Sequence, residues 1–222
     1  MAHEMIRVLI ADDHPIVRKG LRALLIEFDD IDVAGEVGDG REAVSFFRQY
    51  NPDIILMDIV MPKMDGIEAT EIITSEYPDA RILVLTSFIN DEYLFPAIKA
   101  GALGYMLKEA DPKDLVRSIR QIYHGKPSLD PKIARKVLME LSSPRTETSA
   151  SDGLTERETE VLTLLAQGLD NNQIAEQLSV ADVTVRTHIS HILDKLHLSN
   201  RVQATLYALH EGYIIMAGEP EI

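Results

Sequence analysis

The chain has 222 residues, which is too long for one average domain and too short for three, so two domains are expected. Hydrophobic residues make up 45% of the sequence, enough for ordinary globular cores, and the absence of cysteine excludes disulfide bonds and thiol chemistry. The net charge is −14, and no hydrophobic run approaches the length of a membrane-spanning helix. We therefore expect a cytoplasmic protein that does not associate with a membrane.

Residues 6 to about 124 alternate short apolar strands with amphipathic helical segments. The strands are predicted over residues 6–11, 32–37, 53–58, 81–86 and 104–108. Apolar residues recur at helical spacing from Ile16 to Phe28, and again within residues 111–123. This alternation predicts an α/β domain, built on a doubly wound parallel sheet of five strands.

The pattern changes at Gly125 and Pro127, and residues 142–153 are polar with little to bury. We predict a linker over residues 125–153, with a short helix at 131–141. The remainder, residues 154–222, is predicted to form a small all-α domain. Its helices are expected over residues 155–167, 171–178, 182–196 and 201–211.

Five polar residues occur where predicted strands of the first domain end: Asp12, Asp13, Asp58, Thr86 and Lys108. The carboxyl ends of parallel strands meet at one edge of a sheet, so these side chains should converge. Three carboxylates repel one another unless a cation joins them, and Mg²⁺ is a hard ion that prefers such oxygens. A carboxylate can attack phosphorus to give an acyl phosphate, while a lysine and a hydroxyl stabilise the transferred group. Each residue alone could be a cap or a solvated side chain, but the combination predicts phosphoryl transfer to Asp58.

These residues lie in motifs that resemble the receiver domain of bacterial two-component response regulators. The matching segments are Asp12-Asp13, Leu56-Met-Asp-Ile-Val-Met-Pro62, Asp65-Gly66, Thr86-Ser87 and Gly104-Tyr-Met-Leu-Lys108. The resemblance implies a flavodoxin-like fold in which Asp58 accepts phosphate from the phosphohistidine of a sensor histidine kinase. It further implies that Asp12, Asp13 and Asp58 hold Mg²⁺ and that Thr86 and Lys108 contact the phosphoryl group.

The same resemblance implies that Tyr105 turns inward when the hydroxyl of Thr86 moves toward the phosphoryl group. The alternative is that Tyr105 only caps its strand as a half-buried aromatic residue. Val60 and Phe88 are apolar where family members control the access of water, which favours a long-lived phosphorylated state. The alternative is that both residues only pack locally. A further set could form a switching surface on the fourth helix: Tyr93, Phe95 and Pro96.

In the second domain, Thr155 and Glu158 have the spacing of a capping box. The predicted helices 171–178 and 182–196 are separated by only three residues, as in a helix-turn-helix motif. In that motif the second helix enters the major groove of DNA. Two short helices and a tight turn also occur in many helical bundles, so the spacing alone is weak support.

The sequence of these helices gives a stronger indication. The following residues and segments resemble the LuxR-type output domain: Leu154-Thr-Glu-Arg-Glu-Thr-Glu-Val-Leu162, Gly168, Ile174-Ala175, Thr184-Val-Arg-Thr-His188 and Lys195-Leu196. The whole chain is thereby similar to NarL/FixJ response regulators. The segment Thr86-Ser-Phe-Ile together with residues 93–104 resembles regulators of cell-envelope stress. The resemblance implies that Arg186, Thr187 and Ser190 face the groove, whereas Thr184, His188 and Lys195 meet phosphates or support the helix. Protonation of His188, His191 and His197 is expected to strengthen DNA binding below pH 7.

Charge limits how strongly this domain can bind DNA. Residues 154–222 contain four basic residues against ten acidic ones, and residues 182–201 carry a net charge of only +1. Phosphate contacts supply much of the affinity of a protein for DNA, so a single domain should bind weakly. A homodimer on double-stranded DNA with paired half-sites is therefore the expected active form.

Two other classes of function were weighed. A Mg²⁺-dependent phosphatase would need a general acid two residues after Asp58, where the sequence has Val60, so an enzyme is not expected. A regulator whose acidic output domain binds protein instead of DNA would show no salt-sensitive DNA binding after phosphorylation.

Overall fold

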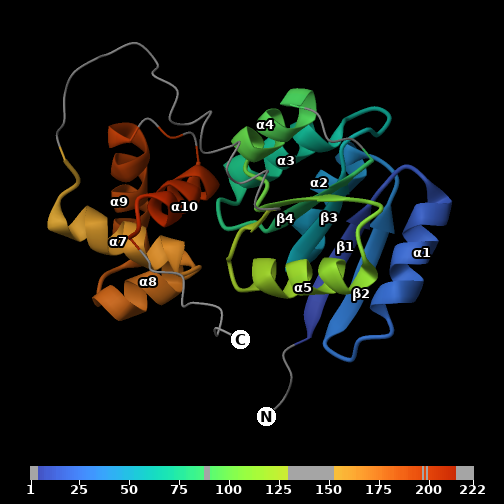
Figure 1. The fold of residues 1–222 in the computed structure, drawn as a ribbon, viewed down its shortest axis with the longest axis horizontal. Helices are drawn as coiled ribbons and strands as arrows, with labels where there is room; N and C mark the ends of the chain where they lie inside the picture. The colour runs from blue at the N-terminus through green and yellow to red at the C-terminus, as the bar shows by residue number, and fades with distance from the viewer. Residues whose placement is uncertain (1–4, 88–90, 130–152, 197, 199, 214–222) are drawn as a thin grey trace, which may run out of the picture. The chain divides into compact units, whose positions relative to one another are not determined.

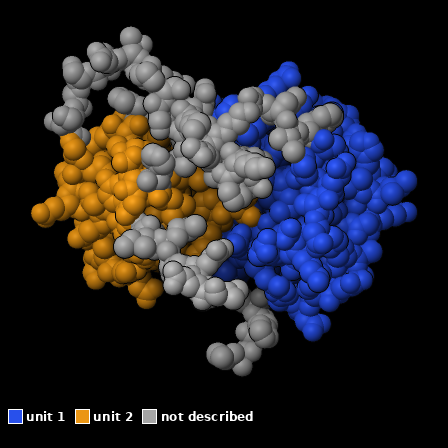
Figure 2. Space-filling model, viewed as in Figure 1, with its two compact units in different colours: residues 1–124 blue, residues 125–222 orange. Residues whose placement is uncertain are grey.

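The computed structural model describes residues 5–87, 91–129, 153–196, 198 and 200–213. The chain divides into two compact units, residues 1–124 and 125–222, which Figure 2 shows in two colours. Each unit has its own hydrophobic core. The predicted helix at 131–141 lies outside the described residues.

A parallel sheet forms the centre of the first unit (Figure 1). Its five main strands are β1 (Ile6–Ala11), β2 (Ile31–Val37), β3 (Ile54–Asp58), β4 (Ile82–Thr86) and β5 (Gly104–Leu107). The strand order is β2-β1-β3-β4-β5-β6, and the pairs that join β2, β1, β3, β4 and β5 are all parallel. The predicted doubly wound α/β fold is thereby confirmed. The sheet also has an edge strand of two residues, β6 (Ser128–Leu129), which follows the boundary at residue 124. It was not predicted because so short a segment shows no periodicity.

The strands are continuous apolar runs because helices cover both faces of the sheet. The five helices are α1 (Pro15–Leu25), α2 (Gly40–Tyr50), α3 (Gly66–Glu76), α4 (Asp91–Ala100) and α5 (Pro112–Tyr123). Phe47 of α2 and Ile73 of α3 pack with Leu9, Ile55 and Met57 on one face. Helices α1 and α5 lie on the other side of the sheet (Figure 1).

Helix α1 differs from its predicted pattern at one position. Its apolar spacing placed Ile16 with the buried residues, yet the side chain of Ile16 is 85% exposed and only Leu25 is fully buried. Ile16 precedes Leu25 by nine residues, which is half a turn out of phase in an α-helix. It therefore points to the opposite side of the helix.

The second unit is a helical bundle made of α7 (Glu156–Ala166), α8 (Asn171–Leu178), α9 (Asp182–Lys195) and α10 (Arg201–His210). Helices α7 and α8 begin with capping boxes at Thr155 and Asp170. The capping box at Thr155 was predicted from the sequence. Ser179, with a φ of 54°, ends α8 in the left-handed conformation and allows the tight turn into α9. The core includes Val161, Leu165, Ile174, Val185 and Ile192.

No helix within the described part of the chain is both long enough and apolar enough to cross a membrane.

Candidate functional site

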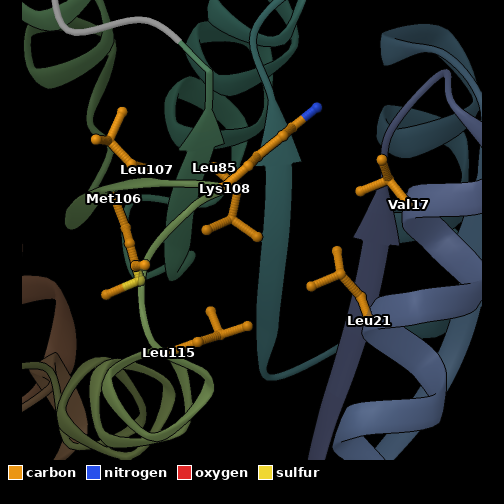
Figure 3. A pocket seen from close by; sticks show the side chains of 8 residues that line it. Val17, Leu21, Leu85, Met106, Leu107, Lys108 and Leu115 are labelled. Carbon is orange, nitrogen blue, oxygen red and sulfur yellow. The ribbon is translucent and has the colours of Figure 1, made fainter.

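The five polar residues predicted to converge all lie at the carboxyl edge of the sheet. Asp12 and Asp13 follow β1, Asp58 ends β3, Thr86 ends β4 and Lys108 follows β5. Figure 3 shows that the stem of Lys108 starts beside a small apolar pocket and that its amine points away from that pocket. The pocket is lined by Val17, Leu21, Leu85, Met106, Leu107, Ala110 and Leu115 together with the stem of Lys108.

The amine of Lys108 bridges two buried carboxylates. Its Nζ lies 2.7 Å from Oδ2 of Asp12 and 2.7 Å from Oδ2 of Asp58. Both acids are almost inaccessible to solvent, with Asp12 2% and Asp58 5% exposed. The remaining oxygens are also held, since Ile59 N–H donates to Asp58 Oδ1 at 2.8 Å and His14 N–H donates to Asp12 Oδ1 at 2.8 Å.

Burial raises the pKa of Asp58, although the hydrogen bond and charge of Lys108 act in the opposite direction. The neighbouring carboxylate of Asp12 adds to the increase. Burial also disfavours the charge on Lys108, but its hydrogen bonds to Asp12 and Asp58 outweigh that effect and raise the pKa of the amine. One internal cation thus serves two carboxylates, which leaves excess negative charge at this edge of the sheet.

A divalent metal ion fits the arrangement of these acids. One ligand atom from each of Asp12, Asp13, His14 and Asp58 lies within 4.8 Å of the others. Oδ1 of Asp13 is a buried atom with no hydrogen bond among the described residues, although Nδ1 of His14 is 2.5 Å away. A cation would satisfy this oxygen. His14 was not predicted as part of this site, although it directly follows the acidic pair Asp12-Asp13 in the sequence.

Thr86 and Tyr105 form a buried pair beside the acids. The Thr86 side chain is fully buried, and Tyr105 is 2% exposed and hydrogen-bonded with Thr86. Burial raises the pKa of Tyr105 to about 12, and the bond with Thr86 offsets part of that increase. The ring therefore lies inside the unit and is not the half-buried strand cap considered as an alternative.

The other residues predicted to be functional in the first unit differ in their exposure to solvent. Val60 is 48% exposed, and Phe88 lies outside the described residues. On α4, Tyr93 and Phe95 are half-buried and Pro96 is exposed.

In the second unit, α9 presents several of the predicted DNA contacts to solvent. Arg186, Thr187, Ser190 and His191 are exposed, whereas Thr184 and His188 are half-buried. Val185, Ile189 and Ile192 form the opposite, buried face of the helix. Val183, an apolar residue that is 67% exposed beside these positions, was not predicted as a surface residue. The sequence could have indicated this exposure, because Val183 lies early in the helix and does not share the spacing of the buried residues Val185, Ile189 and Ile192.

The three basic residues between 182 and 201 all bind partners within the unit. Nε of Arg186 lies 2.7 Å from Oδ2 of Asp182. Nζ of Lys195 lies 2.8 Å from Oε2 of Glu158. Arg201 donates to Oδ1 of Asn171 at 2.7 Å and to the carbonyl oxygen of Leu169. Of the two roles expected for Lys195, its contact with Glu158 favours support of the helix.

An acidic site suited to phosphoryl transfer and a helix-turn-helix unit together define a signalling protein with a DNA-recognition module. Comparison with known families agrees: residues 8–120 match the response regulator receiver domain, and residues 152–208 match the bacterial regulatory proteins of the luxR family. The chain belongs to the response regulators that join a receiver domain to a LuxR-type DNA-binding domain.

Individual relatives extend over nearly the whole chain. The transcriptional regulatory protein LiaR of Bacillus subtilis is 46% identical over 95% of this chain and all of the relative. Among solved structures, the response regulator ChrA of a heme-sensing two-component system is 37% identical, with a TM-score of 0.52 over 95% of this chain and 99% of that one. A structure of two RcsB dimers bound to two parallel DNAs is 28% identical, with a TM-score of 0.56 over 93% of this chain and 98% of that one.

Proposed function

We propose that this response regulator is switched by phosphorylation of Asp58. Asp58 takes a phosphoryl group from the phosphohistidine of a sensor histidine kinase, and the phosphorylated protein binds DNA as a homodimer to regulate transcription. The observation that carries this proposal is the Asp58 carboxylate, which is buried, bonded to Lys108 and adjacent to Asp12. The domains proposed are a receiver at 1–124, a linker at 125–153 and a DNA-binding domain at 154–222.

The chemistry follows from the contacts of Asp58. A carboxylate oxygen of Asp58 forms a bond to phosphorus as the bond from phosphorus to the histidine nitrogen breaks. Lys108 lies 2.7 Å from Oδ2 and neutralises charge on the transferred group. Thr86 ends the neighbouring strand, and its hydroxyl donates to a phosphoryl oxygen once it leaves Tyr105.

The acids Asp12, Asp13 and Asp58 would hold Mg²⁺, and Oδ1 of Asp13 is a buried oxygen with no hydrogen bond among the described residues. When bound, the ion supplies positive charge to the phosphoryl oxygens. The exposed Val60 offers no general acid for rapid hydrolysis, so the proposed site stores a phosphoryl group and does not turn over as an enzyme.

Homodimerisation is proposed for the DNA-bound state. Arg186, Lys195 and Arg201 are already bonded within the unit, so one unit has little positive charge to offer to phosphates. Two units on paired half-sites double the contacts available. The RcsB dimers bound to DNA provide a related example. Such a protein acts in the cytoplasm, where its DNA is located.

The experiment treats wild type and Asp58→Asn with a small acyl-phosphate donor in the presence of Mg²⁺. Intact mass should show one added phosphoryl group on wild type and none on the variant. Hydride reduction of an aspartyl phosphate yields homoserine, which peptide mapping should place at residue 58. No added mass on wild type, or homoserine at another aspartate, would contradict the proposal.

A further inference from the structure

Arg186 and Asp182 form an ion pair on the exposed side of α9. Nε of Arg186 donates to Oδ2 of Asp182 at 2.7 Å, across one helical turn. The side chains are 58% and 34% exposed. Asp182 is in the first turn of α9, where the helix dipole favours a negative charge, so the carboxylate has a reason to stay there.

We propose that Asp182 is a positioning residue that controls the specificity of DNA recognition through Arg186. It orients the guanidinium toward one base pair and, by its own charge, weakens binding to phosphates of unrelated DNA. This inference rests on the proposed function, because it requires α9 to enter the major groove.

The geometry leaves the recognition end of Arg186 available. A guanidinium has five N–H donors, and the bond to Asp182 uses the one on Nε. The two terminal nitrogens can then donate to O6 and N7 of a guanine, the commonest specific contact of arginine with DNA. A side chain that is already oriented loses less conformational entropy on binding. Asp182 thus favours one orientation of the Arg186 guanidinium toward the base pair.

The charge distribution supports the second half of the inference. Lys195 is held by buried Glu158, and Arg201 is held by Asn171 and Leu169. At the exposed start of α9, the charge of Arg186 is offset by that of Asp182. Nonspecific binding depends on uncompensated positive charge, so it should be weak here. Specificity is the ratio of the two affinities, and it rises when nonspecific binding falls.

The test first selects preferred DNA sequences from a random pool with phosphorylated wild type. Binding of single base-pair variants of the selected site is then measured for wild type, Arg186→Ala, Asp182→Asn, Asp182→Glu and Asp194→Asn. Arg186→Ala identifies the base pair that Arg186 contacts. Asp194→Asn is the matched control, since it removes one exposed acid near the other end of the same helix.

In Asp182→Asn, affinity for random DNA should rise by about threefold to tenfold, as expected when one negative charge leaves a DNA-facing surface. Preference at the base pair of Arg186 should fall by about tenfold, within the range for one bidentate contact. Preferences at other positions should be unchanged. Asp182→Glu should restore part of the lost preference, and Asp194→Asn should change affinity for all sequences equally.

Equal effects of Asp182→Asn on selected and random DNA would overturn the positioning role while leaving the proposed function intact. The same conclusion follows if the variant binds like wild type, or if Asp182→Glu, folded by circular dichroism, restores no preference. Failure of phosphorylated wild type to bind any DNA would instead overturn the proposed function together with this inference.

Discussion

Glu158 forms a partly buried ion pair with Lys195 in the second unit, and replacing Glu158 by glutamine should destabilise that unit. The residue is 3% exposed. It accepts hydrogen bonds from Nζ of Lys195 at 2.8 Å, from the N–H of Thr155 at 2.7 Å and from Oγ1 of Thr155 at 2.9 Å. The bond from Lys195 is the largest of the effects that hold the pKa of Glu158 at about 2, compared with an ordinary value of 4.5.

The difference between these two pKa values of Glu158 determines how much the ion pair contributes to the folding free energy. At about 1.36 kcal/mol for each pH unit, a pKa of about 2 in place of 4.5 corresponds to roughly 3 kcal/mol of folding free energy. Lys195 is 30% exposed, so solvent screening reduces this to about 2 kcal/mol. Because the pKa is lowered on folding, the stabilisation is present above about pH 4.5 and is lost as the pH falls toward 2.

The assay is urea unfolding of the full chain, followed by NMR through the amides of α7 and α9, so that the second unit is observed separately. Glu158→Gln should lose about 2 kcal/mol at neutral pH and most of the acid sensitivity of this unit. Glu160→Gln is the matched control on the same helix, since its partner Arg157 and Glu160 itself are both substantially exposed. It should change stability by less than about 0.5 kcal/mol. Equal losses in the two variants, or unchanged acid sensitivity in Glu158→Gln, would refute the reasoning.

Two further predictions concern the first unit. Lys108→Met should raise the affinity for Mg²⁺ by about tenfold, because the amine that competes for the oxygens of Asp12 and Asp58 is removed. Isothermal calorimetry measures this, with the exposed Lys113→Met as control, and equal affinities in the two variants would contradict it. The second prediction is that Tyr105→Phe makes the stability of the first unit less sensitive to high pH. Because folding raises the pKa of Tyr105 to about 12, the first unit loses roughly 1 to 2 kcal/mol between about pH 10 and pH 12. If urea unfolding shows the same pH dependence for wild type and Tyr105→Phe, Tyr105 is not the group that causes this loss of stability.

The sequence predicted the fold because its strands are continuous apolar runs with distinct ends. The predicted strand at 6–11 coincides with β1, and the predicted helix at 171–178 coincides with α8. The acidic site was predictable in outline because the strand ends were recognisable in the sequence. A parallel sheet brings the ends of β1, β3, β4 and β5 to one edge.

Contacts between distant side chains of the helical unit were not predictable. Lys195 and Glu158 are 37 positions apart, and Arg201 and Asn171 are 30 apart, so only the packing of the bundle brings them together. From sequence alone, Lys195 and Arg201 were expected on a weakly basic surface, although each binds a partner within the unit. The amine of Lys108 was expected at the phosphoryl group, but its additional bond to Asp12 depends on side-chain geometry that periodicity does not encode.

A phosphoryl group on Asp58 is proposed to control the pairing of two DNA-binding domains. The most direct test measures the stoichiometry and affinity of the protein on a selected DNA fragment with paired half-sites, before and after treatment with an acyl-phosphate donor at fixed salt. Phosphorylated wild type should bind as two copies, much more tightly than the untreated protein, and Asp58→Asn should not respond. Binding of the same stoichiometry and affinity with and without the phosphoryl group on wild type would contradict the claim.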